Sequence, residues 1–165
     1  INGKKKITKK EYYNLVDSIK SFGYGLKINT VVTIENSNEI LIDFIEFAQP
    51  TRWKIFQVLP ISGQNDGKVN ELEITKETFE NFIMRNKKES TKIEIVPENN
   101  SQMKGSYVMI DPAGRFFTNS NGKHRYSQPI LEVGCQNALK EMDYDKEKFE
   151  ERGGLYDWVK KAKVA

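Results

Sequence analysis

The chain of 165 residues has a single cysteine, no long apolar run and only a small net charge, and each shortage excludes a class of protein. One cysteine cannot form an internal disulfide, so nothing indicates an oxidising compartment and we expect a cytoplasmic protein. No apolar run approaches the roughly 20 residues of a membrane span and no signal-peptide pattern is present, so we expect no membrane partner. The net charge of +3 is too small to indicate a nucleic-acid partner. The sequence has no zinc-spaced set of cysteine and histidine, so we expect no metal site in this chain.

Helices and strands alternate in the first hundred residues. Thr8 and Glu11 have the spacing of a capping box, and apolar residues then recur at helical spacing as far as Gly23. Strands are predicted over 26–33, 52–59 and 92–96, and helices over 38–48 and after the N-cap residue Thr75. This order predicts an α/β fold with right-handed crossovers and a parallel sheet.

The pattern changes after Pro97. A hairpin is predicted over 106–118, because Asp111 to Gly114 has the residues of a type I turn. A basic loop is predicted over 119–128, a helix over 136–142, and a short helix from the N-cap residue Asp145 to Gly153 and Gly154. We therefore expect two units, residues 1–96 and residues 97–165.

Polar residues inside two predicted strands are the main candidates for chemistry. Residues two apart in a strand face the same way, so Lys27 shares a face with Asn29, and Arg52 shares one with Lys54. On neighbouring strands the four could form one wall, and buried cations need an anionic ligand or several carboxylates. A triphosphate would suit such a wall. The alternative is that each pair lies at a sheet edge in solvent.

Other polar residues are weaker candidates. Lys123, His124 and Arg125 lie in the basic loop, where solvation competes with a role in phosphate binding. Cys135 has the character of a small buried residue rather than a ligand. Tyr107 begins the predicted hairpin, and its ring can pack while its hydroxyl contacts a ligand.

Four segments, in order, resemble the viperin family of radical S-adenosylmethionine (SAM) enzymes. They are Lys27–Val32 (KINTVV), Arg52–Gln57 (RWKIFQ), 96–107 (VPENNSQMKGSY) and 152–158 (RGGLYDW). The first also resembles the molybdenum-cofactor enzyme MoaA and its relatives, so it indicates only the superfamily. The other three are more specific, and together they match the C-terminal half of a viperin-like enzyme.

The resemblance implies a fold and an activity. It implies the C-terminal half of a partial (βα)6 TIM-like barrel, the radical SAM fold, followed by a C-terminal α+β extension. The implied enzyme is a lyase that converts a nucleoside triphosphate (CTP, UTP or GTP) to its 3′-deoxy-3′,4′-didehydro analogue, an antiviral chain terminator. Its cofactors are SAM and a [4Fe-4S] cluster.

The resemblance also assigns roles to residues. Lys27, Arg52, Lys54 and Arg152 would bind the triphosphate, with Arg152 closing the C-terminal tail over the phosphates. Asn29 would hydrogen-bond a ribose, that of SAM or its cleavage product. Tyr107, a candidate catalytic residue, would lie near the substrate ribose.

The Cys-x3-Cys-x2-Cys motif that holds the cluster in such enzymes is absent, and the chain begins with Ile1 rather than Met. These features suggest a fragment, inactive alone, whose partner is the missing N-terminal half of the barrel. Two alternatives stay open. One is a MoaA-like enzyme acting on a peptide or another small molecule, and the second is a non-catalytic nucleotide-binding module.

Overall fold

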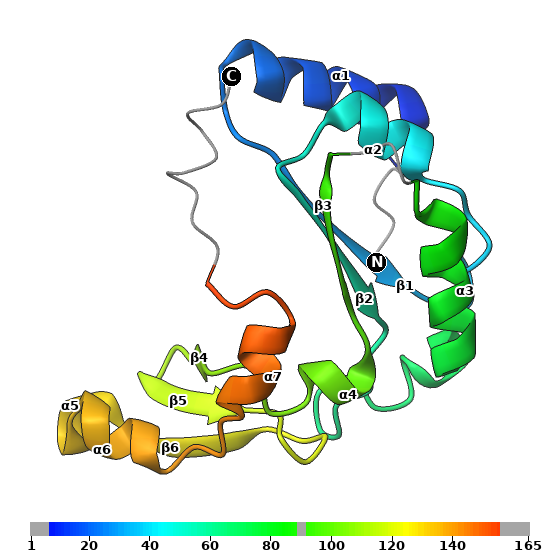
Figure 1. Cartoon of the computed structure of the whole chain (residues 1–165). Helices are drawn as coiled ribbons and strands as arrows, with labels where there is room; N and C mark the ends of the chain where they lie inside the picture. Colours follow the sequence, from blue (N-terminus) through cyan, green and yellow to red (C-terminus); the bar gives the residue numbers. More distant parts are fainter. Residues whose placement is uncertain (1–6, 89–91, 156–165) are drawn as a thin grey trace.

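A computed structural model describes residues 7–88 and 92–155. They form an α/β structure with one parallel and one antiparallel three-stranded sheet (Figure 1). The parallel sheet has the order β1 (Lys27–Val32), β2 (Arg52–Gln57), β3 (Glu94–Glu98), and the antiparallel sheet the order β4 (Met109–Ile110), β5 (Arg115–Thr118), β6 (Arg125–Pro129). The helices are α1 (Lys9–Ser21), α2 (Ile42–Ala48), η1 (Asn70–Leu72), α3 (Lys76–Asn86), α4 (Asn100–Met103), α5 (Ile130–Val133), α6 (Cys135–Lys140) and α7 (Lys146–Glu151).

Three helices begin at the N-cap residues that the sequence predicts. Thr8 and Glu11 form a reciprocal capping box at the start of α1, which satisfies backbone donors that have no partner within the helix. The hydroxyl of Thr75 accepts from the backbone N–H of Thr78 at the start of α3, and the carboxylate of Asp145 accepts from Lys148 at the start of α7. The predictions of these three helix starts are confirmed.

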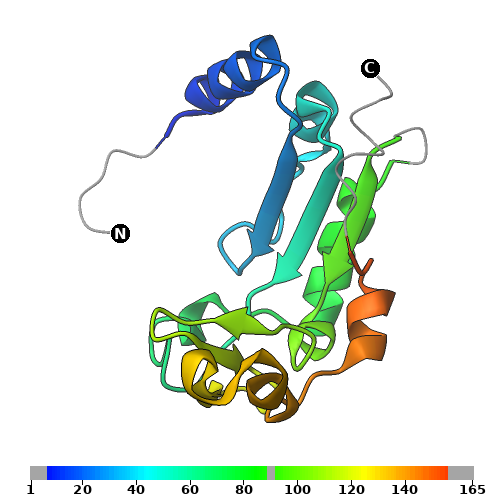
Figure 2. The same cartoon turned by 90° about the vertical axis from the view of Figure 1, so that its left-hand side faces the viewer.

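The main core lies between the parallel sheet and α2 and α3. Trp53 and Ile55 of the central strand are fully buried there, together with Phe79 and Phe82 of α3. Figure 2 shows α3 behind the sheet, so the opposite face of the sheet is turned toward the viewer. Because side chains alternate between the two faces along a strand, the neighbours of the buried Trp53 and Ile55 in β2 lie on the opposite face.

The antiparallel sheet lies beyond the carboxyl ends of β1 and β2, at the bottom of Figures 1 and 2. Its predicted hairpin is confirmed, with Asp111 N–H donating to the Arg115 carbonyl across the turn. The prediction that 119–128 is only a loop is wrong, since β6 pairs with β5 from residue 125 onward. The polar sequence of this segment has no apolar alternation that would predict a strand, whereas Phe116 of the neighbouring β5 packs with Ala138 of α6.

The described residues form an α/β fold but no closed barrel. The predicted division between residues 96 and 97 falls inside β3, which continues to Glu98. Each side of this division has its own hydrophobic cluster, one around Trp53 and the other around Phe116. Within the described ranges no helix is long and apolar enough to cross a membrane.

Candidate functional site

The strand register brings the four predicted polar residues onto one face of the parallel sheet. Lys27 is aligned with Arg52, and Asn29 with Lys54. Aligned residues of parallel strands point the same way, and Trp53 and Ile55 occupy the opposite, helix-covered face. The four therefore share the face opposite α2 and α3. Their environments differ, because Lys27 and Asn29 are exposed on edge strand β1 whereas Arg52 and Lys54 are each only 6% exposed on central β2.

Each buried cation of β2 pairs with a carboxylate of β3. Nη2 of Arg52 lies 2.5 Å from Oε1 of Glu94, the residue aligned with it. Nζ of Lys54 forms an ion pair with Oε1 of Glu98. Burial of a charge is costly without such a partner, so the carboxylates stabilise both cations in place. Glu94 and Glu98 were not among the residues predicted for the site. Residues at even spacing along a strand share a face, so their four-residue spacing is the signal that could have placed both beside the cations.

Glu98 is the centre of the site. Its side chain is fully buried, and it contacts groups from three separate parts of the chain. Besides Lys54, its Oε2 accepts a 2.5 Å hydrogen bond from the hydroxyl of Tyr107 and lies 3.5 Å from Nη1 of Arg152. One carboxylate thus connects β2, the segment after α4 and the residue that follows α7.

Arg152 is held in the site by contacts with Glu98, Tyr107 and Ser106. It is 6% exposed, and its Nη2 donates a 2.7 Å hydrogen bond to the carbonyl of Ser106. Its guanidinium carbon lies 3.7 Å from the centre of the Tyr107 ring, a cation–π arrangement. The C-terminal tail beyond residue 155, which Arg152 is expected to close over the phosphates, lies outside the described residues.

Burial shifts two pKa values within this network. Desolvation lowers the pKa of Lys54, and the hydrogen bond and charge of Glu98 oppose that shift, while the positive charges of Arg152 and Lys27 add to it. Desolvation, followed by the hydrogen bond to Glu98, raises the pKa of Tyr107 well above its ordinary value. Tyr107 is therefore a neutral phenol at physiological pH, and its proton is directed to Glu98.

The network contains more positive than negative side chains. Its charged members are the cations Lys27, Arg52, Lys54 and Arg152 and the carboxylates Glu94 and Glu98. These six carry an excess of positive charge on one sheet face. A multiply charged anion is the ligand class that such a face can bind, through bidentate contacts to arginine and point-charge contacts to lysine.

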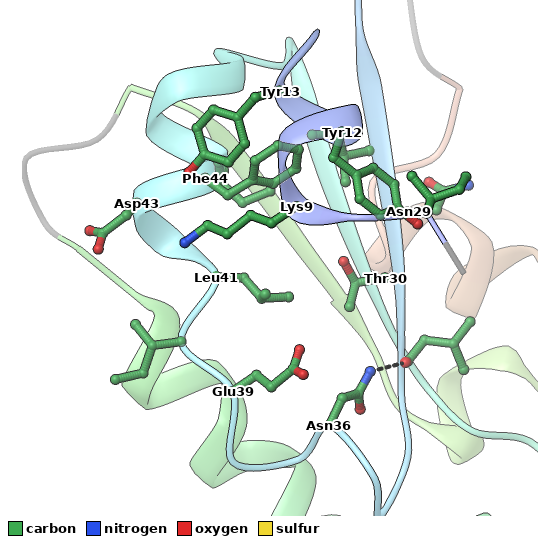
Figure 3. A pocket seen from close by; sticks show the side chains of 15 residues that line it. Lys9, Tyr12, Tyr13, Asn29, Thr30, Asn36, Glu39, Leu41, Asp43 and Phe44 are labelled. Atoms are coloured by element: carbon green, nitrogen blue, oxygen red, sulfur yellow. Dashed lines mark hydrogen bonds between the residues drawn. The ribbon is translucent and has the colours of Figure 1, made fainter. Parts of the chain in front are cut away.

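A groove runs along the free edge of β1. It has a volume of roughly 670 Å³ and lies between β1, α1 and α2, as Figure 3 shows. Apolar residues such as Ile7, Tyr12 and Val31 line it and are exposed, and Asn29 forms part of its wall. Asn36 closes part of the edge by donating a 3.0 Å hydrogen bond from Nδ2 to the Val31 carbonyl.

The weaker candidates are outside the ionic network. His124 packs against Phe117, with ring centres 4.9 Å apart, and Arg125 pairs with Asp143 near α6. Cys135 is exposed at the start of α6 and not buried as expected. Across the residues with described positions, no group of three histidine, cysteine or acidic side chains could hold a metal ion.

Comparisons with known proteins point to one enzyme class, although no family model matches the chain. An S-adenosylmethionine-dependent nucleotide dehydratase of Lacinutrix mariniflava is 56% identical over 158 residues, covering 96% of this chain and 33% of that protein. A protein of the same name from Flammeovirga pacifica is 51% identical over 148 residues, covering 89% and 50%. The Danio rerio protein named S-adenosylmethionine-dependent nucleotide dehydratase RSAD2 is 34% identical over 146 residues, covering 86% and 40%. The chain thus spans between a third and a half of the length of these relatives.

Proposed function

The chain belongs to the viperin family of S-adenosylmethionine-dependent nucleotide dehydratases, and on this premise we propose that it supplies the active-site wall that binds the nucleoside triphosphate. The reaction that we propose for the family-length protein converts CTP, UTP or GTP to the 3′-deoxy-3′,4′-didehydro analogue, a chain terminator for antiviral defence. This reaction eliminates water, and the enzyme is accordingly a lyase.

The observation that carries the proposal is the ionic network on the face of the parallel sheet opposite α2 and α3. Lys54 and Arg152 share one buried carboxylate, so their combined charge exceeds that of their common partner. Lys27, which is exposed on the same face, adds a further cation close enough to affect the pKa of Lys54. Phosphate oxygens would complete this balance, and we assign the triphosphate to these three residues together with Arg52.

The remaining assignments concern hydroxyl groups of the ligands. Tyr107 already donates its proton to Glu98, so its phenol oxygen can accept a hydrogen bond from a ribose hydroxyl. Asn29 lies on the same sheet face as Lys54, on the neighbouring strand β1. Its amide offers both a donor and an acceptor to a ribose, which we propose is that of SAM. In this assignment both residues orient ligands, and Tyr107 is the catalytic candidate because it faces the reacting sugar.

The [4Fe-4S] cluster does not fit this chain. Such clusters are held by several cysteine thiolates, whereas the sequence has Cys135 alone, exposed and away from the ionic network. We therefore propose that the cluster and most of the SAM site belong to another part of the family-length protein. The contribution of the chain itself is to bind and orient the nucleotide.

The free edge of β1 is where that other part is proposed to attach. β1 is the outer strand of the parallel sheet, and the groove beside it is lined with exposed apolar side chains, among them Tyr12 and Val31. A further parallel strand, with its helix, would pair with this edge and cover the groove. We propose that residues 1–96 form half of a partial (βα)6 barrel in this way, that 97–165 form its extension, and that the protein is cytoplasmic.

A non-catalytic nucleotide-binding module is the second candidate, favoured by the lack of cluster ligands among the residues described. One experiment separates the two. The family-length protein containing this chain is reconstituted anaerobically, given SAM with CTP, UTP or GTP in turn, and assayed for 5′-deoxyadenosine and a nucleotide product lighter by one water. If the protein is the proposed enzyme, both products should form with at least one of the three nucleotides. Nucleotide binding without SAM cleavage supports the module, SAM cleavage without nucleotide binding supports the MoaA-like alternative, and neither result is compatible with the proposed function.

A further inference from the structure

We propose that Glu98 is a positioning residue of this site, whose carboxylate keeps Lys54 in its ammonium form and holds Tyr107 and Arg152 in the arrangement that a polyphosphate meets. The inference rests on the proposed function for the identity of the ligand, but its effect on Lys54 can be measured without any ligand. It identifies the side chain on which the triphosphate wall depends, although that side chain is itself an anion.

Glu98 is the last residue of β3 and lies among side chains from several parts of the chain. The side chain is fully buried, so water does not stabilise its charge. Lys54, Tyr107 and Arg152 surround it, and two of these come from outside the parallel sheet. A charge with this degree of burial persists only where its partners are fixed, and the same contacts fix the partners in turn.

The ion pair with Glu98 favours the protonated form of Lys54. Among the described residues, the charged groups other than Glu98 that act on this amine are cations, Lys27 on β1 and Arg152 after α7. The other neighbours are the Phe56 ring, 5.1 Å from Nζ, and the neutral phenol of Tyr107, 3.5 Å away. Without the carboxylate, burial and the two like charges would all favour the neutral amine, which has no charge to offer a phosphate.

Glu98 also contacts both Tyr107 and Arg152. The phenol donates to Oε2 of Glu98, which leaves only oxygen lone pairs for a ligand. The guanidinium of Arg152 is stacked on the Tyr107 ring and has a second bond to the Ser106 carbonyl. Glu98 thereby leaves the tyrosine oxygen as an acceptor toward a ligand. It also provides one of the two polar contacts that hold Arg152, the other being the Ser106 carbonyl.

The test compares Glu98→Gln with Glu94→Gln in the family-length protein. Glutamine keeps the shape of the side chain and an acceptor for Tyr107, and each variant removes one negative charge from the same sheet face. Glu94 pairs with Arg52, whose guanidinium does not lose its proton in proteins. Only Glu98→Gln should therefore change a protonation equilibrium.

The readout is CTP affinity as a function of pH, above about pH 7.5 so that the phosphates stay ionised. In the wild type, affinity should fall as pH rises through the pKa of Lys54. In Glu98→Gln the midpoint should move down by about one pH unit or more, a tenfold change in the protonation equilibrium. Glu94→Gln should keep the wild-type midpoint. An unchanged midpoint in Glu98→Gln overturns the proposal.

Two further measurements cover a variant that fails to fold and a ligand that fails to bind. Lys54→Arg, with Glu98 intact, should bind CTP with little pH dependence over this range, and a wild-type pH profile in this variant contradicts the proposal. Titration of the Lys54 amine by NMR in the absence of nucleotide should show the lowered pKa in Glu98→Gln. If that shift occurs but CTP does not bind the wild type, the triphosphate assignment fails while the role of Glu98 stands.

Discussion

Gly153 lies against the guanidinium of Arg52: a Cβ atom at residue 153 would sit 3.3 Å from Nη2. The residue also has φ +98°, a conformation that side chains rarely adopt. The segment after α7 therefore packs directly on a cation of the β2 strand. Glycine suits this position both through its close approach to Arg52 and through its backbone angle.

Replacing Gly153 with alanine should weaken triphosphate binding. The added methyl group requires the Arg52 guanidinium to shift by a few tenths of an ångström, and we expect a loss of up to roughly tenfold in affinity, the value of one charge-assisted contact. Gly23→Ala is the matched control, because Gly23 has φ +72° with nothing within 4 Å of the added carbon. Both variants should lose about 1–3 kcal/mol of stability through backbone strain. Equal CTP affinity in the two, measured by calorimetry, would show that Gly153 has no role in placing Arg52.

Lys54→Ala and Arg52→Ala should each weaken nucleoside triphosphate binding more than SAM binding in the family-length protein. Each removes a buried, charge-assisted contact worth on the order of 1.5–3 kcal/mol, which is roughly ten- to a hundredfold in affinity. Lys76→Ala, at an exposed lysine of α3 paired with Glu80, should change neither affinity. Calorimetric titration with CTP, UTP, GTP and SAM measures the effect. An equal loss for SAM would refute the triphosphate assignment and favour a MoaA-like enzyme.

Arg152→Ala should be at least as severe as these two changes. Arg152 is already buried between Glu98, Tyr107 and the Ser106 carbonyl, so binding a phosphate requires little further ordering of this side chain. Alanine would also leave that carbonyl without this donor. A CTP affinity within about twofold of the wild type would place the phosphates elsewhere.

Asn86→Ala should destabilise the fold without touching the ionic network. The buried amide of Asn86 accepts from the Leu41 N–H at 2.6 Å and donates to the carbonyls of Glu39 and Phe82, both at 3.0 Å. Leaving buried backbone groups unpaired should cost about 2–3 kcal/mol in the free energy of unfolding. Asn137→Ala, at an exposed position of α6, should stay within about 0.5 kcal/mol. Denaturant unfolding measures both, and equal values would mean that the 39–41 segment is held by other contacts.

The sequence predicts the local structure of this chain better than its packing. Capping at Thr8 and Thr75 and the turn at Asp111 depend on residues within a few positions of one another, and all three occur as predicted. Helices of a single turn such as α4 and α5 have too few residues for an apolar period and were not predicted. Periodicity identifies the apolar face of α1, but Tyr12 and Leu15 are exposed, although the Tyr12 ring meets that of Phe44 in α2.

Half of the candidate site follows from strand periodicity and half requires the register. Two-residue spacing is enough to place Lys27 beside Asn29 and Arg52 beside Lys54 on one face. The sequence also indicates that buried cations need carboxylates, but not which ones. Glu98 becomes the partner of Lys54 only because β3 pairs with β2 in the register that aligns Glu98 with Phe56, two residues beyond Lys54. Tyr107 and Arg152 reach it through two further segments that no local pattern brings together.

This chain alone should bind no [4Fe-4S] cluster and cleave no SAM. Cluster irons are held by several cysteine thiolates, and the sequence offers one, exposed at the start of α6. Anaerobic reconstitution with iron and sulfide, followed by optical spectroscopy and a 5′-deoxyadenosine assay, tests this expectation. Any residual iron should be substoichiometric and should be unchanged in Cys135→Ala, since adventitious iron needs no defined ligand. A stoichiometric cluster with SAM cleavage would show that the nucleotide-binding wall and the radical chemistry lie in the same 165 residues.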